Sequence, residues 1–244
     1  MNKLDFAGVG LTFEGGATAL EGVDLTIDRG EFVSVVGPSG CGKSTLLRIA
    51  SGLTQATTGT VDVSAERIGY VFQDATLLPW RTVQRNVELL PELAGQDRSR
   101  RRDAAREAIA TVGLTGYEHY LPRQLSGGMR MRASLARSLT LEPDLFLFDE
   151  PFGALDELTR ERLNDEVLAM FADLRFAGLF VTHSVSEAVY LSTRVVVMSP
   201  GPGRIVASFD VPFGLRRDPK LRFGSEFAEL TEQVSDALRE GISR

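Results

Sequence analysis

Short apolar runs bounded by turn residues recur along the chain and alternate with segments of helical periodicity. Five such runs lie at 31–37, 68–72, 144–148, 178–182 and 194–198. They show little alternation of polar and apolar residues, a pattern typical of strands buried on both faces of a sheet. Helical patterns lie between them, as in the segments that begin at Lys43, Gly127 and Glu157. The alternation predicts an α/β fold in which helices pack on a mostly parallel sheet.

Two regions depart from this pattern. The first thirty residues and the segment 203–211 alternate more clearly and carry more turn signals, which indicates a smaller antiparallel sheet at one edge. From about Thr82 to Leu141 only helical stretches appear, so we expect a helical insertion in the α/β core. The expected organisation is a single domain, 1–244, with a core of 1–81 and 142–215, a helical subdomain over 82–141 and a C-terminal helical tail over 216–244.

Composition and charge act mainly by excluding classes of protein. The chain has 244 residues, 43% of them hydrophobic, which is enough for a real core. A net charge of −6 argues against a surface built to bind nucleic acid, so we expect no nucleic-acid partner. The basic cluster at 98–106 is interpreted as a solvated helix face rather than a site for an acidic partner.

The length of the apolar runs and the cysteine content indicate the cellular compartment of the protein. No apolar run approaches the roughly 18 residues of a membrane span, and no secretory signal is visible at the N-terminus. The single cysteine, Cys41, cannot form an intrachain disulfide. We therefore expect a cytoplasmic protein whose membrane role, if it has one, comes through a partner.

The clearest chemical motif is GPSGCGKST at 37–45, which follows a predicted strand and opens a predicted helix. This is the context that the phosphate-loop pattern GxxxxGK[ST] requires. Its glycines let backbone amides wrap a β-phosphate, and the helix N-terminus adds partial positive charge. Lys43 is expected to reach the β- and γ-phosphates, and the Ser44 hydroxyl to bind Mg²⁺. The expected nucleotide-binding residues are Gly37, Pro38, Ser39, Gly40, Cys41, Gly42, Lys43, Ser44 and Thr45.

Two weaker interpretations of this segment are set aside. A glycine-rich turn that holds no ligand is possible in principle, but the strand, loop and helix context favours a phosphate site. Cys41 lies inside the loop, where a reactive thiol is conceivable, yet a small space-filling residue is favoured over a nucleophile.

A second motif, DLFLFDE at 144–150, places Asp149 and Glu150 at the end of a buried strand. Unpaired buried charge is costly, so something must compensate it. Mg²⁺ held through water by Asp149 would do so, leaving Glu150 to polarise a water for attack on the γ-phosphate. The alternative is a pair of carboxylates that caps a helix before Pro151.

A further glycine-bearing segment, LSGG at 125–128, lies between these motifs. With the phosphate loop, LSGG and LFLFDEPFGALD (145–156) in this order, the chain resembles the ATP-binding-cassette ATPases nearly from end to end. The resemblance implies a P-loop NTPase core of RecA type that hydrolyses ATP as a head-to-tail dimer. In that family the LSGG segment of one subunit caps the ATP held by the phosphate loop of the other. Ser126, Gly127 and Gly128 would therefore meet the γ-phosphate across the interface.

The resemblance also assigns four single residues. Gln73 in YVFQD matches the glutamine that senses Mg²⁺ and the attacking water, and that contacts the membrane partner. His183 in FVTHS matches the histidine that contacts the γ-phosphate, although a lone histidine after a strand is more often structural. Asp156 matches the aspartate that communicates between the two sites. Phe13 falls where the family stacks an aromatic ring on adenine, with an ordinary edge-strand aromatic as the alternative.

Together these assignments give two small groups of residues. The expected catalytic residues are Lys43, Glu150 and His183, and the expected Mg²⁺ ligands are Ser44, Gln73 and Asp149. Three positions depart from the family pattern: Met129 and Met131 stand where glutamine is frequent, and Ser184 where aspartate is common. None of them carries a group assigned to chemistry.

The segment LLPWRTV at 77–83, with LSGGMRMR and SPGPGRI, is similar to the importer ATPases for nitrate, sulfonates and taurine. The resemblance implies the motor subunit of a bacterial importer: a homodimer that binds two permease subunits on the inner face of the cell membrane and acts indirectly with a substrate-binding protein. Trp80 is either an anchor for the permease or a core tryptophan.

The alternative function is a soluble, non-transport ATPase of the same family that acts on chromosomes or ribosomes. Chromosome-type members need a long coiled-coil insertion, whereas only 79 residues, 46–124, separate the phosphate loop from LSGG. Ribosome-type members usually carry two cassettes in one chain, and this chain has one phosphate loop. Both observations favour the importer subunit.

Overall fold

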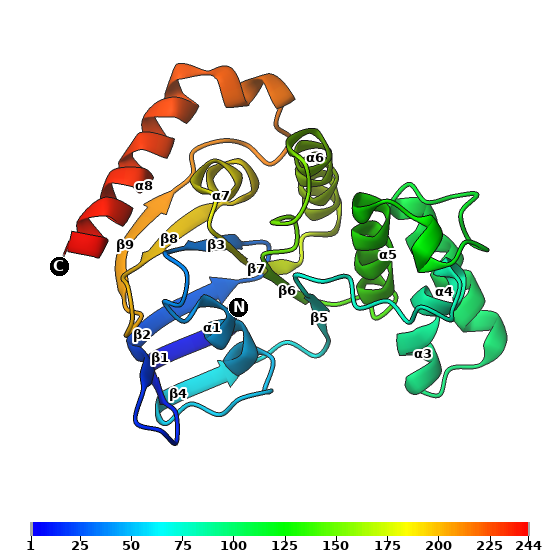
Figure 1. Cartoon of the computed structure of the whole chain (residues 1–244), viewed down its shortest axis with the longest axis horizontal. Coiled ribbons are helices and arrows are strands. Elements are labelled where there is room, and N and C mark those ends of the chain that lie inside the picture. Colours follow the sequence, from blue (N-terminus) through cyan, green and yellow to red (C-terminus); the bar gives the residue numbers. More distant parts are fainter. Residues whose placement is uncertain (1, 244) are drawn as a thin grey trace.

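The unalternated apolar runs form the centre of a six-stranded sheet. In the computed structural model, which describes residues 2–243, its strands lie in the order β5-β6-β7-β3-β8-β9 (Figure 1). These strands are β3 (Phe32–Val36), β5 (Ile68–Val71), β6 (Leu145–Asp149), β7 (Ala177–Thr182), β8 (Arg194–Met198) and β9 (Ile205–Asp210). Every neighbouring pair is parallel except β8 and β9. The predicted α/β fold with a mostly parallel sheet is confirmed.

A smaller antiparallel sheet contains β1 (Asn2–Thr12), β2 (Thr18–Asp28) and β4 (Thr58–Val63) in the order β2-β1-β4. The prediction for the first thirty residues is therefore correct. The segment 203–211 is antiparallel as expected but has a different partner: β9 pairs with β8 in the large sheet. The reason is the turn at 199–204, closed by a bond from the Ser199 amide to the Arg204 carbonyl, which folds the chain back on β8.

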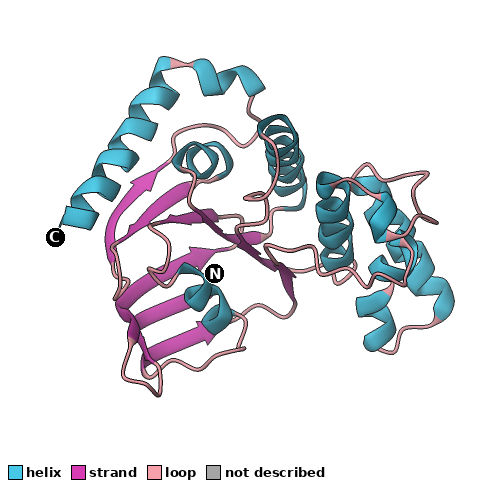
Figure 2. Ribbon diagram, viewed as in Figure 1, coloured by secondary structure: helices cyan, strands magenta, loops and turns pink. Residues whose placement is uncertain are grey.

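Helices cover both faces of the large sheet. Figure 2 shows α1 between the two sheets, α6, α7 and α8 on the opposite face, and α2 to α5 as a separate layer beside β5. The helices are α1 (Lys43–Ala50), α2 (Val83–Val87), α3 (Leu89–Leu93), α4 (Arg98–Thr111), α5 (Gly127–Leu139), α6 (Glu157–Leu174), α7 (Val185–Leu191) and α8 (Ser225–Ser243), with 3-10 turns η1 (Pro122–Gln124) and η2 (Pro219–Phe223).

The hydrophobic core has two halves, one on each face of the large sheet. Val33 and Val35 of β3 pack with α1 and the smaller sheet. Phe32 points to the other face, where its ring lies 5.2 Å from that of Phe171 on α6. Because both faces are buried, the carboxyl ends of the strands are the edge at which a ligand is expected to bind in such a sheet.

Candidate functional site

The phosphate-loop motif forms a tight connection between β3 and α1. Gly42 has φ 100°, and a Cβ at this position would lie 2.8 Å from the carbonyl oxygen of Ala19. Only glycine adopts this conformation without strain, so the loop shape depends on it. Within residues 2–243 no side chain caps the start of α1. Its first amides are therefore available to an anion.

Lys43 folds back over this loop. Its Nζ donates to the carbonyl oxygens of Gly37 at 2.9 Å and Pro38 at 3.0 Å. The same atom lies 3.7 Å from Glu150 Oε1, and the side chain is only 5% exposed. A buried ammonium is thus held between the loop and the end of β6, where it meets the predicted carboxylate.

Ser44 and Asp149 form a pair of oxygen donors beside Lys43. Ser44 Oγ donates to Asp149 Oδ1 at 2.7 Å, and Tyr70 Oη donates to Asp149 Oδ2 at 3.4 Å. Burial and the Asp149 charge raise the pKa of Tyr70, so its hydroxyl stays protonated. Gln73 follows β5, the strand next to β6, at the same edge of the sheet. Hydroxyl, carboxylate and amide oxygens are donors that Mg²⁺ accepts.

Glu150 and His183 meet at the ends of two neighbouring strands. Glu150 Oε2 lies 2.8 Å from Nδ1 of His183, which follows β7. The backbone of Glu150 has φ 44°, a left-handed conformation, and its amide donates to the Val181 carbonyl oxygen at 2.9 Å. For a residue other than glycine this conformation costs on the order of 1–3 kcal/mol, a strain that is found mainly at functional sites.

Two further residues predicted to bind the nucleotide differ in their exposure. Cys41 is buried, with its sulfur 2.7 Å from where a Cβ of Gly37 would lie, and burial raises the pKa of its thiol. Both observations fit a space-filling residue rather than a nucleophile. Phe13 lies between β1 and β2 with its side chain 51% exposed, so its ring is free to stack on a planar ligand.

The LSGG segment lies at the start of α5, apart from the residues described so far. Ser126 caps α5 by accepting from the Met129 amide at 3.3 Å, and Asp156 caps α6 by accepting from the Thr159 amide at 3.0 Å. The bonds from Thr159 hold the pKa of Asp156 below its usual range. A Cβ on Gly128 would lie 2.6 Å from Thr159 Cγ2, so the two helix starts touch each other. Within residues 2–243 neither cap is hydrogen-bonded to the phosphate loop.

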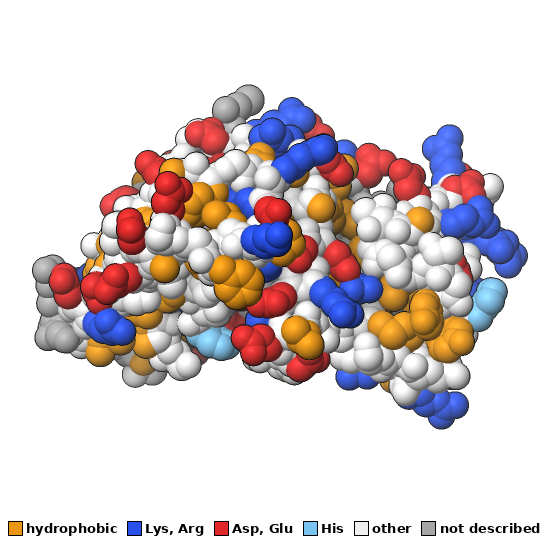
Figure 3. Space-filling view, turned by 90° about the horizontal axis from the view of Figure 1, so that it is seen from above, with side chains coloured by type: hydrophobic (Ala, Val, Ile, Leu, Met, Phe, Trp, Pro, Cys, Tyr) orange, Lys and Arg blue, Asp and Glu red, His pale blue; other side chains and the backbone are white. Residues whose placement is uncertain are grey.

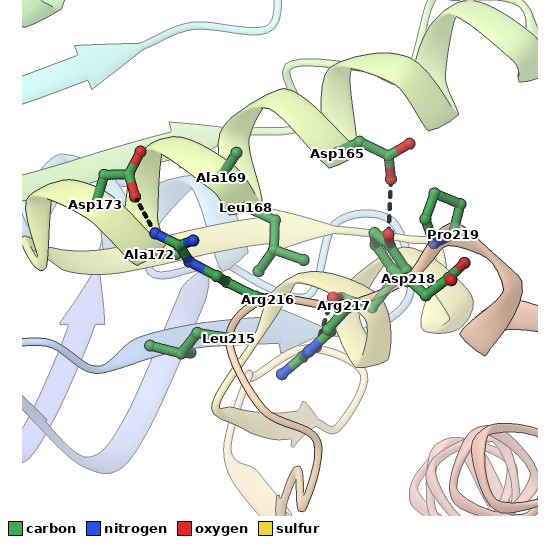
Figure 4. A pocket seen from close by; sticks show the side chains of 11 residues that line it. Asp165, Leu168, Ala169, Ala172, Asp173, Leu215, Arg216, Arg217, Asp218 and Pro219 are labelled. Atoms are coloured by element: carbon green, nitrogen blue, oxygen red, sulfur yellow. Dashed lines mark hydrogen bonds and ion pairs between the residues drawn. The ribbon is translucent and has the colours of Figure 1, made fainter.

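A groove of about 450 Å³ lies between the C-terminal half of α6 and residues 215–219 (Figure 4). Its charged groups bond to neighbouring protein groups: Asp173 pairs with Arg216 at 3.2 Å, and Asp165 accepts from the Tyr190 hydroxyl at 2.7 Å. Arg217 donates to the Val189 and Ser192 carbonyl oxygens, and burial lowers its pKa to about 10. These contacts attach residues 215–219 to α6 and α7, so the groove is a structural junction between these segments.

The sequence did not decide whether Trp80 is buried or exposed, and Tyr70 was not among the residues predicted for the site. The Trp80 side chain is 73% exposed, which excludes a core tryptophan. Tyr70 contributes the donor to Asp149, and the available signal was a polar aromatic residue in the strand that pairs with β6.

Comparisons with known proteins identify the family to which the chain belongs. The family model described as ABC transporter matches residues 20–153. The taurine import ATP-binding protein TauB of Yersinia pestis is 44% identical over 209 residues, 82% of either chain. The nitrate import ATP-binding protein NrtD of Synechocystis is 40% identical over 238 residues, covering 92% of this chain and 90% of NrtD.

Solved structures of ABC transporter cassettes have the same fold as this chain. The dimeric structure of MJ0796, a bacterial ABC transporter cassette, is 30% identical with a TM-score of 0.76 and covers 86% of this chain and 100% of MJ0796. A post-hydrolysis dimer of the same cassette, bound to ADP and Pi, has a TM-score of 0.74. Across residues 2–243, the structure contains no helix with the length and apolarity that a membrane crossing demands.

Proposed function

This chain belongs to the ABC transporter family, and from that membership we propose that it is the ATP-hydrolysing motor subunit of an importer for a small anion such as nitrate, a sulfonate or taurine. The chain binds ATP and is an ATPase of this family. The observation that carries the proposal is the meeting of Lys43, Glu150 and His183 at one edge of the sheet. The anion class is supported by the similarity to TauB and NrtD, whose names state taurine and nitrate import.

The site residues take separate roles toward ATP. Lys43 turns from the loop carbonyls to the β- and γ-phosphates, while Phe13 stacks on the adenine. Ser44, Asp149 and Gln73 would hold Mg²⁺, and the ion would neutralise phosphate charge. Glu150 polarises the attacking water, and His183, oriented by its bond to Glu150, faces the γ-phosphate.

The second cradle serves a second copy of the chain. Ser126 and the amides of Gly127 and Gly128 lie at the start of α5, away from the phosphate loop of their own chain. We infer that they cap the ATP of the partner copy, with Asp156 communicating between the two sites. The dimeric state of MJ0796 supports this arrangement.

The helical layer supplies the contact with the permease. Trp80 is exposed, and the bond from the Val83 amide to the Tyr120 carbonyl oxygen brings the half-exposed Tyr117 and Tyr120 beside this segment. Figure 3 shows hydrophobic side chains gathered on this end of the molecule. Such a patch fits one helix of a permease subunit. Two copies of the chain would then bind two permease subunits, which would hold the dimer on the cytoplasmic face of the membrane and connect it to a substrate-binding protein.

The test is reconstitution with the membrane subunits that co-purify with the chain and with the binding protein. ATP hydrolysis is measured in vesicles while nitrate, sulfonates and taurine are added one at a time. One of these anions is expected to stimulate hydrolysis and to accumulate inside the vesicles. Hydrolysis that none of these compounds stimulates would contradict the proposed anion class.

A further inference from the structure

Glu187 lies directly behind His183, buried in the first turn of α7 with only 6% of its surface exposed. Its Oε2 accepts from the Thr182 hydroxyl at 2.5 Å. That hydroxyl also accepts from the Ser184 amide at 3.1 Å, and the Glu187 amide donates to Ser184 Oγ at 3.3 Å. Both residues that flank His183 are therefore fixed by Glu187.

The other side of the Glu187 carboxyl faces α6. Burial raises its pKa, and the Thr182 bond, the charge of Arg160 and the amide of Asn164 lower it in part. Asn164 is 4% exposed, and Arg160 Nη2 donates to the Leu155 carbonyl oxygen at 2.9 Å. Leu155 precedes Asp156, the residue that caps α6. The Glu187 carboxyl thus contacts the His183 turn through Thr182 and lies in the electrostatic field of Arg160, which is bonded to the turn before Asp156.

The cluster is incompletely hydrogen-bonded. Among the residues that the structure describes, Glu187 Oε1, Asn164 Oδ1 and Arg160 Nε are buried without a hydrogen-bond partner. Native proteins rarely leave buried polar atoms unpaired, and those that they do leave are often tied to function. They belong to α6 and to the first turn of α7, next to the His183 turn.

We propose that Glu187 is a positioning residue for His183, which it orients through Thr182. The inference rests on the proposed function for the role of His183. Glu187 is buried beneath the His183 turn, and it acts by fixing the backbone on both sides of the imidazole.

The kinetic test compares removal of the contact with its conservative replacement. E187A and T182V are expected to lower kcat by about 10- to 100-fold through misplacement of the imidazole, with KM for ATP unchanged. E187Q keeps an acceptor for Thr182 and T182S keeps the hydroxyl, so both should retain kcat within about twofold. The E187A/T182V double variant is expected to be no slower than the worse single variant, because both changes remove one interaction.

A matched control lies on the same helix. Y190F removes a partly buried hydrogen bond between α7 and Asp165 of α6 but no contact with Thr182, so it should leave kcat unchanged. Equal losses in Y190F and E187A, or multiplicative losses in the double variant, would overturn the proposal in favour of general packing of α7.

A second readout is independent of turnover. The chain has two histidines, His119 and His183, so labelled imidazoles give two resonances. E187A and T182V should shift the His183 resonance and leave that of His119 in place, whereas E187Q should shift neither. An unmoved His183 resonance in folded E187A and T182V would overturn the positioning role. A wild-type chain that hydrolyses no ATP would instead contradict the proposed function and leave this spectroscopic test intact.

Discussion

Glu150 combines a strained backbone with a charged side chain that has two partners. Its φ of 44° turns the chain sharply after β6, so that one carboxylate oxygen faces Lys43 and the other faces His183. A carboxylate held this way is a hydrogen-bond acceptor for water at the place where a γ-phosphate is expected. We therefore expect changes at Glu150 to affect the hydrolysis of ATP more than its binding.

Replacing Glu150 with glutamine should preserve the shape of the site and remove the base. We expect E150Q to bind ATP but to turn it over about 10²- to 10⁴-fold more slowly, so that the ATP-bound dimer accumulates. Phosphate release and light scattering measure the two effects. The control is E142Q, because Glu142 also has a positive φ, 47°, but is exposed and forms a surface ion pair with Arg67. Wild-type turnover by E150Q would rule out the assignment of the base.

At the scale of elements, Asp144 fastens three strands together just before β6. It accepts from Lys3 Nζ of β1 at 2.5 Å and from the Arg67 amide, which precedes β5, at 3.0 Å. Burial acts to raise the pKa of Asp144, but the bonds from Lys3 and the backbone amides outweigh it and hold the pKa below its usual range. The carboxylate form therefore stabilises the junction between the two sheets.

Because the folded pKa of Asp144 is depressed, its contribution is fully present above the unfolded pKa of about 3.9 and is lost as pH falls through the folded pKa. D144N is expected to lower the free energy of unfolding at pH 7 by about 1–2 kcal/mol, a difference that should shrink below about pH 4. Urea unfolding at several pH values measures it. D173N, which removes an exposed pair, should cost less than about 0.5 kcal/mol. A pH-independent difference for D144N would contradict the ionic origin.

The elements also mark where sequence patterns stop being informative. Runs such as β3 and β6 were predictable because strands buried on both faces are apolar throughout. The strand β4 gives little such signal, since most of its residues are exposed and it depends on pairing with β1. The partner of β9 depends on the 199–204 turn, and the contact of Glu187 with α6 depends on how two helices meet, which no local pattern specifies.

Some residues of the candidate site can also be predicted from local sequence patterns, and others cannot. The closeness of Lys43 and Ser44 to Asp149 and Glu150 was predictable, because the phosphate loop follows β3 and the carboxylates stand at the end of β6, and parallel strands bring their carboxyl ends together. His183 and Ser126 needed the family resemblance, because a lone histidine and a serine before a helix occur in many folds. The exposure of Trp80 was not readable at all, since an isolated tryptophan fits a core and a binding surface equally well.

At the scale of the whole molecule, the exposed face of the helical layer is where the permease is expected to dock. W80A should weaken co-purification with the membrane subunits while ATP affinity stays unchanged, because Trp80 lies outside the phosphate loop. Affinity chromatography and ATP titration measure the two properties. F223A is the control, since Phe223 is 87% exposed in η2, near the C-terminal helix. Equal loss of the membrane subunits in both variants would indicate a general effect of surface aromatics.

The head-to-tail dimer predicts that Ser39 of one copy approaches Ser126 of the other only when ATP lies between them. In an E150Q background, mixing S39C chains with S126C chains and adding a short bismaleimide should give a species of twice the chain mass with ATP and little with ADP. Cys41 is buried with a raised thiol pKa, so it should add little background. Chains carrying only one of the two changes serve as controls. A cross-link that forms equally well without nucleotide would mean that the two glycine-bearing segments meet for a reason other than a shared ATP.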